Sequence, residues 1–423
     1  MNQSARARRR GIGKIILLIG VFEHGGAERQ AFLLARELRR SHGLDVEAWA
    51  LWFPGSYSET FEMAGIPTRV LNFHAPDYRN VGVKRIRIPA RIHLRDDPRY
   101  PLRWVHRLWR VSRQLKERQA DVVLPFTTWP NVVAGLTYRL AGARFCLWGE
   151  RHSGGERVPG LERLAVTQYR KFAANSTAGV EFLKRDMGVP HERIAFIPNG
   201  IEEPRFEGAT DWRAQLGLTP GQPLIVKVAS LSSFKDHFTL LRAWKLVQDN
   251  WAGAERPVLA LAGAHYDTYE GCARLVQEMA LGRTVQFLDR VSDIAGLLDA
   301  SDIGVFSSRA EGMPNAVLEC MAAGKAIIAT DIPGIRDALG DGANGVLVPP
   351  GDADQFARKM TTLLRNPDMR QQLGHLNRER IRSEFSVQRM ATRYLEIIRS
   401  GLSKSHGNAQ PIQSSWEPQN VPE

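Results

Sequence analysis

Short apolar runs alternate along the chain with longer segments whose apolar side chains recur at helical spacing. In the first half the strand-like runs are residues 14–22, 45–53, 120–126, 144–151, 173–176 and 193–206, the last ending in a loop. The helical segments between them are 26–43, 131–143, 161–172 and 177–188. This alternation predicts an α/β domain built on a parallel sheet.

A polar segment with several prolines and glycines, residues 202–222, interrupts the pattern as a linker would. A second series of strand-like runs follows it, at 223–231, 257–264, 284–288, 303–308, 325–331 and 344–349. We therefore predict two α/β domains that face each other across a cleft. Ligands of such sheets bind at the carboxyl ends of the strands.

The two ends of the chain carry different signals. Four arginines within residues 6–10 precede the short apolar run 15–22, but no small-residue cleavage site follows, so we expect a first strand and not a signal peptide. No stretch approaches the ~20 apolar residues of a membrane span. Two final helices are predicted near 354–364 and 387–399, and the polar residues 401–423 are expected to be disordered.

Composition adds limits on size and compartment. The chain has 423 residues, 43% of them hydrophobic, which suits two globular cores better than one. Its cysteines, Cys146, Cys272 and Cys320, lie far apart and without metal-type spacing. We expect a reducing, cytoplasmic location with no disulfides and no metal site.

The net charge of +12 allows nucleic acid, an anionic membrane surface or phosphorylated substrates as partners. Much of the positive charge lies in residues 78–119, where three arginines share one helical face and three apolar residues another: Arg103, Arg107 and Arg110, and Trp104, Leu108 and Val111. Either this helix lies at a lipid headgroup layer, which would place the protein at the inner face of the membrane as a peripheral protein, or its apolar stripe enters the core. Nucleic acid ranks last, because no zinc-finger or RNA-binding motif is present.

The stretch 307–334 carries the clearest chemistry. A buried strand is followed by a loop, and Pro314 is placed for the first turn of a helix that Gly324 ends. The N–H groups at such a helix start form an anion site that suits a diphosphate. Glu311 lies just before this helix and Glu319 within it. Glu319 can accept hydrogen bonds from a ribose diol; the plainer alternatives are a capping role for Glu311 and a surface position for Glu319.

Two further signals are weak alone. Gly25 and Gly26 follow the first strand as in a phosphate-binding turn, although a tight strand-to-helix connection explains them nearly as well. Lys235 follows the first strand of the second domain and could extend a cation toward the cleft, although surface lysines are common.

Five segments together resemble glycosyltransferase family 4, the retaining enzymes that use nucleotide sugars. They are GGAE at 25–28, IPNGIE at 197–202, ASLSSFKD at 229–236, the stretch from Ser307 to Asp337, and residues 342–357. The resemblance implies the GT-B fold, two Rossmann-like domains with a cleft between them. It places the acceptor-side domain at 1–204, the donor-binding domain at 205–384, and a helix that crosses back to the first domain at 385–400.

The resemblance also implies roles for individual residues. Glu319 would hold the donor ribose, Glu311 would face the transferred sugar, and Lys235 would neutralise the diphosphate, so that Glu311 and Lys235 are the catalytic candidates. The other candidates lie near the donor's sugar and phosphates: Gly312, Met313, Asn315, Ala316, Gly25 and Gly26. The implied route is front-face attack, in which the leaving phosphate oxygen takes the acceptor proton, and it needs no metal or cofactor.

The sequence departs from the family pattern in two places. Ser230 stands where many members have an arginine that pairs with the diphosphate, so either Lys227 substitutes or Lys235 works alone. Residues 127–131 replace a histidine of the first domain. Arg151 or His152 could contact the donor instead, with purely structural roles equally open.

The expected function is transfer of a hexose or N-acetylhexosamine from a nucleoside-diphosphate sugar, such as a UDP-sugar, to a lipid-linked or polysaccharide acceptor in cell-surface glycan synthesis. Two alternatives stay open at this point. The missing arginine fits a nucleotide-sugar-binding protein without transferase activity, and the architecture fits a nucleotide-sugar epimerase, against which the spacing of Glu311 and Glu319 argues.

Overall fold

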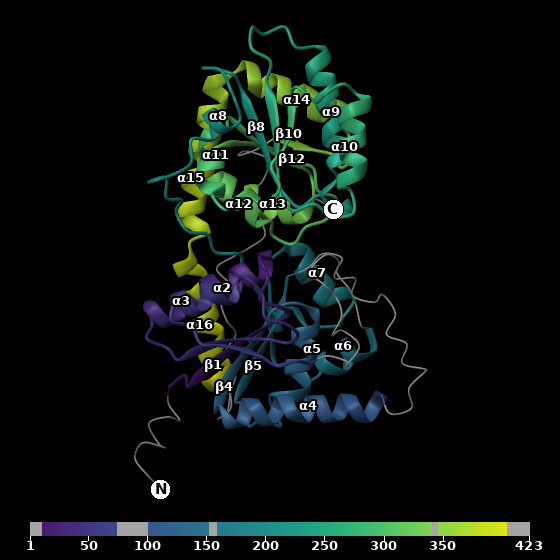
Figure 1. Cartoon of the computed structure of the whole chain (residues 1–423). Helices are drawn as coiled ribbons and strands as arrows, with labels where there is room; N and C mark the ends of the chain where they lie inside the picture. Colours follow the sequence, from purple (N-terminus) through teal and green to yellow (C-terminus); the bar gives the residue numbers. More distant parts are fainter. Residues whose placement is uncertain (1–10, 74–99, 152–158, 341–345, 404–423) are drawn as a thin grey trace.

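The computed structural model describes residues 11–73, 100–151, 159–340 and 346–403. The chain forms two α/β domains, one above the other in Figure 1, each with a parallel sheet and helices on both faces. This confirms the predicted fold class. The tail was predicted at 401–423, but residues 401–403 belong to the last helix. Residues 404–423 and the arginines of residues 6–10 lie outside the described residues. None of the described helices is long and apolar enough to cross a membrane.

The N-terminal domain has a seven-stranded parallel sheet in the order β3-β2-β1-β4-β5-β6-β7. The strands are β1 Lys14–Ile19, β2 Val46–Ala50, β3 Thr68–Val70, β4 Ala120–Pro125, β5 Phe145–Glu150, β6 Lys171–Ala174 and β7 Ile194–Phe196. The helices are α2 Gly26–Arg40, α3 Ser58–Met63, α4 Tyr100–Glu117, α5 Thr128–Thr137, α6 Pro159–Val166 and α7 Thr177–Arg185, with a 3-10 turn η2 at His191–Arg193. The short edge strand β3 was not predicted.

Side chains of β1 alternate between two cores, as the pleat of a strand requires. Ile15 and Leu17 pack with α2, whereas Ile16 and Leu18 pack on the other face with α4 and α5. The strand is buried on both faces, which explains its continuous apolar run.

The C-terminal domain has a six-stranded parallel sheet in the order β10-β9-β8-β11-β12-β13. Its strands are β8 Leu224–Val228, β9 Val258–Ala262, β10 Val285–Phe287, β11 Ile303–Phe306, β12 Ala326–Thr330 and β13 Val346–Val348. Its helices are α8 Trp212–Gln215, α9 His237–Asp249, α10 Tyr269–Glu278, α11 Ile294–Ala300, α12 Asn315–Ala322, α13 Pro333–Leu339, α14 Ala353–Arg365 and α15 Pro367–Glu384, with a 3-10 turn η3 at Ser233–Lys235.

The last helix, α16 at Val387–Ser403, packs against α2 and β5 of the N-terminal domain. The chain enters it beside the other interdomain connection, where Ile201 and Ser386 form a β-bridge. The helix continues past Ser400, where we expected it to end, because Gly401 is buried against the ring of Phe145.

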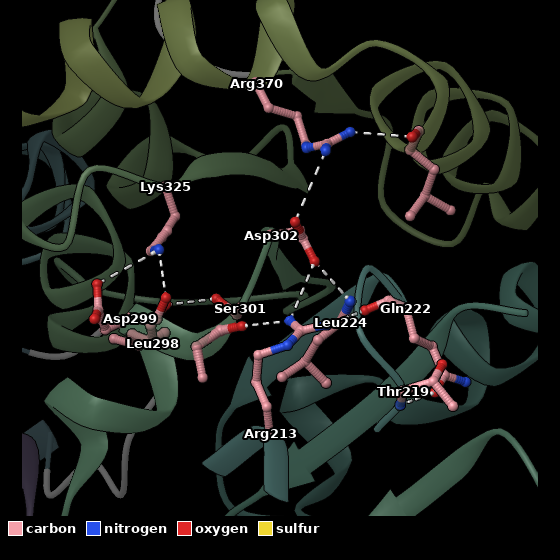
Figure 2. Close-up of polar contacts among 12 residues, drawn as sticks. Arg213, Thr219, Gln222, Leu224, Leu298, Asp299, Ser301, Asp302, Lys325 and Arg370 are labelled. Carbon is pink, nitrogen blue, oxygen red and sulfur yellow. Dashed lines mark hydrogen bonds and ion pairs between the residues drawn. The ribbon is translucent and has the colours of Figure 1, made fainter. Parts of the chain in front are cut away.

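A polar cluster joins the amino-terminal ends of the C-terminal strands (Figure 2). Asp302 precedes β11 and accepts a hydrogen bond from the backbone N–H of Leu224 at 2.8 Å, while Arg213 and Arg370 approach the same carboxylate. This cluster ties α8 and α15 to the sheet at the end opposite the strands' carboxyl ends. It is therefore a structural cluster.

Candidate functional site

Both sheets reverse their strand order at one point, and the candidate residues lie there. In the C-terminal sheet the reversal falls between β8 and β11, which are hydrogen-bonded neighbours. The loop after β8 carries Lys235, and the loop after β11 carries Glu311. The carboxyl ends of strands at such a switch point are where ligands of open α/β sheets bind. In the N-terminal sheet the corresponding strand is β1, which Gly25 and Gly26 follow.

Lys235 and Glu311 form an ion pair across the switch point. The hydroxyl of Ser308 donates a second hydrogen bond to the same carboxylate oxygen of Glu311 at 2.8 Å. Both charged side chains are mostly buried, with 18% and 12% of their surface exposed. The structure thus brings together the two residues for which the sequence predicts catalytic roles, and it pairs them with each other.

Lys227 lies behind this pair and is completely buried. Its ammonium donates to the backbone carbonyl of Lys235 at 2.5 Å and to the hydroxyl of Ser307 at 2.6 Å. Burial, together with the charge of Lys235, lowers the pKa of Lys227 to about 7. The suggestion that Lys227 replaces the missing arginine does not fit this position. It supports the backbone of the Lys235 loop from inside the domain.

The start of α12 fits the predicted anion site. Pro314 caps the helix, and no described residue accepts a hydrogen bond from the backbone N–H groups of Asn315 or Ala316. These groups therefore remain available to an anionic ligand at the positive end of the helix. Met313, just before the helix, is buried.

Glu319 faces the other domain, where Arg29 of α2 forms an ion pair with its carboxylate. The Glu319 side chain is 11% exposed and that of Arg29 is 41% exposed. A carboxylate in a mostly apolar helix needs a specific partner, but the sequence did not identify Arg29 as that partner. The carboxylate that we expect to bind the ribose is thus paired with a cation from the facing domain.

A second set of contacts links the domains through amide side chains. Asn315 donates to the carbonyl of Gly26 at 3.1 Å, and Asn199 donates to the side-chain oxygen of Asn315 at 2.7 Å. Gln30, fully buried, exchanges two hydrogen bonds of 2.9 Å with the backbone of Gly200. The conspicuous PNG sequence at 198–200 therefore serves as the polar junction between the domains.

Arg151 belongs to this junction. Its guanidinium donates to Asn199 and to the hydroxyl of Tyr394, both at 2.7 Å, and it lies over the ring of Phe126. These contacts give the buried guanidinium a structural role at the junction, and a contact between Arg151 and the donor stays a prediction. His152, the alternative candidate, lies outside the described residues.

The backbone of the Glu311 loop is held between two close neighbours. A side chain at Gly312 would lie 2.7 Å from the carbonyl oxygen of Arg151. A side chain at Gly334, in α13, would overlap the carbonyl oxygen of Gly312. Both glycines are therefore required by close backbone approach.

This packing predicts that Gly334→Ala displaces the loop that carries Glu311. We expect transferase activity to fall by about 100-fold, since small misplacements of reacting groups have effects of that size, and stability to fall by about 2 kcal/mol. Steady-state kinetics and denaturant unfolding measure the two effects. Gly282→Ala is the matched control, because a side chain there meets nothing within 4 Å. Equal activity of both variants would contradict the prediction.

Glu28 is the acidic residue of the GGAE segment, and its side chain folds back over Gly25. A side chain added at Gly25 would overlap the carboxylate of Glu28. Burial raises the pKa of Glu28 to about 7, with a further contribution from the charge of Glu23 and an opposing one from a backbone hydrogen bond. The acid is thus half-ionised near neutral pH at the turn that we expect to meet the diphosphate.

A pH dependence of stability follows from this shift. Because the folded-state pKa lies above the usual value of 4.5, the stabilising contribution of protonated Glu28 is present at low pH and lost as pH rises through 7. Between pH 5 and 8 the wild type should lose about 2 kcal/mol relative to Glu28→Gln. Urea unfolding at both pH values tests this. The exposed Glu59→Gln serves as control, and identical pH profiles of the wild type and Glu28→Gln would contradict the assignment.

The N-terminal loop that lacks the family histidine has an unusual backbone. Thr127 adopts φ 76° and ψ 170°, a conformation that favours glycine, directly after β4. Asn131, fully buried, holds the start of α5 by two hydrogen bonds to the backbone of Gly149, at 2.9 and 3.0 Å. Thr127 thus lies at the N-terminal switch point in a conformation that its neighbours enforce.

The two facing Rossmann-like domains, with their charged groups gathered at the switch points, define the class of GT-B glycosyltransferases. Residues 24–205 match the family model described as Glycosyltransferase Family 4, and residues 209–380 match the one described as Glycosyl transferases group 1. The two models together cover both domains, so the chain resembles the family 4 glycosyltransferases over most of its length.

Two of the curated relatives match about half of the chain, at moderate sequence identity. The glycosyltransferase EpsD of Bacillus subtilis is 33% identical over 211 residues, which are 49% of this chain and 52% of that protein. The lipopolysaccharide core biosynthesis glycosyltransferase LpsE of Rhizobium meliloti is 29% identical over 231 residues, 53% of this chain and 63% of that one. The chain thus spans little more than half the length of these curated relatives.

The fold extends over nearly the whole chain. HepE of Anabaena, solved in complex with UDP and glucose, superposes with a TM-score of 0.75 and 20% sequence identity, covering 92% of this chain and all of that one. In the described part of this chain no group of three or more His, Cys, Asp or Glu side chains is arranged to hold a metal ion.

Proposed function

We propose that this protein is a retaining glycosyltransferase that moves a hexose or N-acetylhexosamine from a nucleoside-diphosphate sugar to a lipid-linked or polysaccharide acceptor. The observation that carries the proposal is the convergence of Lys235, Glu311 and the open start of α12 at one switch point, with Glu319 further along the same helix. The relationship to a lipopolysaccharide core enzyme supports the acceptor class, and the UDP complex of a structural relative supports the donor class.

The arrangement can hold each part of the donor. The diphosphate accepts hydrogen bonds from the backbone N–H groups of Asn315 and Ala316. Its negative charge draws the ammonium of Lys235 away from Glu311 and toward the phosphates. The ribose diol displaces Arg29 and donates hydrogen bonds to the carboxylate of Glu319. Gly25 and Gly26 approach from the facing domain, where Asn315 already contacts the carbonyl of Gly26.

The chemical step breaks the bond between the anomeric carbon and the phosphate oxygen, and it forms a bond from the acceptor oxygen to the same face of the sugar. Negative charge grows on the leaving diphosphate, which Lys235 and the helix start stabilise. The acceptor proton passes to the leaving phosphate oxygen. Glu311, released from Lys235, faces the transferred sugar and hydrogen-bonds its hydroxyl groups. The protein supplies no nucleophile and no metal in this scheme.

A coupled assay tests the proposal. The protein is incubated with UDP- and GDP-sugars and a polyprenyl-diphosphate-linked sugar acceptor, and released nucleoside diphosphate and the anomeric configuration of the product are measured. Transfer with retained configuration is expected. Inverted product would contradict the retaining mechanism, donor binding without turnover would favour a binding protein, and conversion of the donor without acceptor would favour an epimerase.

A further inference from the structure

Lys227 is the only buried lysine in the described part of the chain, and it lies behind the Lys235 loop. Its Nζ donates to two neutral oxygens, the carbonyl of Lys235 at 2.5 Å and the hydroxyl of Ser307 at 2.6 Å. No carboxylate of the described residues lies within ion-pair distance of it. Because a buried cation without a paired carboxylate is costly, this position calls for a role beyond packing.

Ser307 supports the same turn beside Lys227. Its buried hydroxyl donates to the carbonyl of Asp236 at 2.8 Å, so that Lys227 and Ser307 hold two consecutive carbonyls. Asp236 adopts the left-handed conformation, with φ 45° and ψ 57°, and caps α9 by accepting a hydrogen bond from the N–H of Thr239. These contacts fix, from inside the domain, the turn that directs the Lys235 side chain toward Glu311.

The charge of Lys227 depends on the groups around it. Burial and the charge of Lys235 bring its pKa down to about 7, while the acidic neighbours oppose this shift. The titratable groups that face it are Lys235 and Asp236 after β8, His237 in α9, Cys272 in α10 and Glu311 after β11.

Two of these neighbours do not change their charge near neutral pH. Burial and the two lysines lower the pKa of His237 to about 2, and no described residue hydrogen-bonds its ring nitrogens. Burial raises the pKa of Cys272 to about 11. A change in the charges above the Lys235 loop therefore acts on the protonation of Lys227.

We propose that Lys227 is a positioning residue for the donor, which holds the Lys235 turn from inside the domain and takes up a proton when the diphosphate binds. The proposal rests on the proposed function. The diphosphate brings two negative charges to the outer side of this turn, and they favour the ammonium form of Lys227. The proton comes from the solvent, and no bond of the donor changes. Lys227 acts through the turn and does not touch the phosphates, so this role differs from replacement of the missing arginine.

Titration calorimetry at pH 8 in two buffers of different ionisation enthalpy counts the protons taken up. The probes are UDP-glucose and GDP-mannose, whose phosphates do not titrate near neutral pH. The wild type should take up about 0.8 proton per bound probe, and its affinity should fall about fivefold between pH 7.5 and 8.5. Lys227→Met, of similar length but uncharged, should take up almost none and keep its affinity over this range.

Two further variants separate the proton from the support of the turn. Ser307→Ala keeps the lysine, so it should retain the uptake while binding the probe about tenfold more weakly. Lys325→Met is the matched control. Lys325 is also mostly buried, but it donates to the carbonyl of Asp299 in the cluster of Figure 2, at the opposite end of the sheet. This variant should behave as the wild type does, and melting temperatures show that all variants are folded.

The outcomes distinguish this proposal from the proposed function. Wild-type protein that binds a probe without taking up a proton would overturn the role of Lys227 alone. So would uptake that survives in Lys227→Met and disappears in Glu28→Gln, since the proton would then go to the GGAE turn, where the pKa of Glu28 is also about 7. Protein that binds neither probe would overturn the proposed function and this role with it.

Discussion

Replacing Glu319 with alanine is expected to weaken nucleoside-diphosphate binding by about 100-fold, because a carboxylate that accepts two hydroxyl hydrogen bonds contributes about 3 kcal/mol. Titration calorimetry measures the loss directly. The structure complicates this experiment, since the same substitution breaks the ion pair with Arg29 and could act through the domain interface.

Arg29→Ala separates the two effects. It removes the same ion pair but leaves the carboxylate, so the donor no longer has to displace a cation from it. We expect Arg29→Ala to bind nucleoside diphosphate as tightly as the wild type or up to tenfold more tightly. If both variants lost affinity equally, the ion pair itself would be needed for binding, and the assignment of Glu319 to the ribose would fail. Melting temperatures show whether the fold is intact.

Lys235→Ala is expected to lower kcat by about 100- to 1,000-fold, the range found when a group that stabilises developing negative charge is removed. The effect on donor affinity should be smaller, because the start of α12 still binds the diphosphate. Glu311→Gln, which removes the ion-pair partner but not the ammonium, should retain more activity than Lys235→Ala. Steady-state kinetics with the donor identified by the transfer assay measure both values.

Lys245→Ala provides the matched control. Lys245 is also paired with a carboxylate, that of Asp249 one turn along α9, but it lies on the surface of the domain. Its replacement should leave kcat unchanged. An active Lys235→Ala enzyme would show that the diphosphate is neutralised by another group, and the mechanism would have to be reassigned.

The positions of most strands along the chain were predictable because both faces of each sheet are buried. Runs such as residues 14–22 and 303–308 have few polar interruptions, and the boundaries of β1 and β11 fall within them. The helix α12 was predicted with its cap and its end, since Pro314 and Gly324 are local signals. The three-residue edge strand β3 lacks such a run, and its side chains are only partly buried.

The polar helix α15, in contrast, has few local sequence signals that would predict it. Of its eighteen residues only Leu373, Gly374, Asn377 and Ile381 are buried, so the sequence carries little apolar period there. Its position depends on contacts far away in sequence, such as the hydrogen bond from Asn377 to the carbonyl of Lys325 at 2.8 Å.

The site was predictable in its residue types but not in its pairings. The sequence placed Lys235 and Glu311 in loops after two strands, and the structure shows that these strands are hydrogen-bonded neighbours at the switch point. It gave no sign that Arg29 would meet Glu319, because these residues lie in different domains. It also suggested that Lys227 replaces the missing arginine, although this side chain, near the end of β8, is completely buried in the domain. Charge alone does not indicate on which side of a sheet a residue lies.

The return of α16 to the N-terminal domain has a consequence for synthesis of the chain. Val387, Met390 and Ile398 belong to the same core as β1 and α2, more than 340 residues earlier in the chain. The domain that leaves the ribosome first therefore cannot close its core until the last helix has been translated. The core of the C-terminal domain is complete by residue 385, so this domain can fold before the N-terminal domain does. Loss of α16 through a late stop codon should expose the apolar surface of the N-terminal domain and leave the C-terminal domain folded.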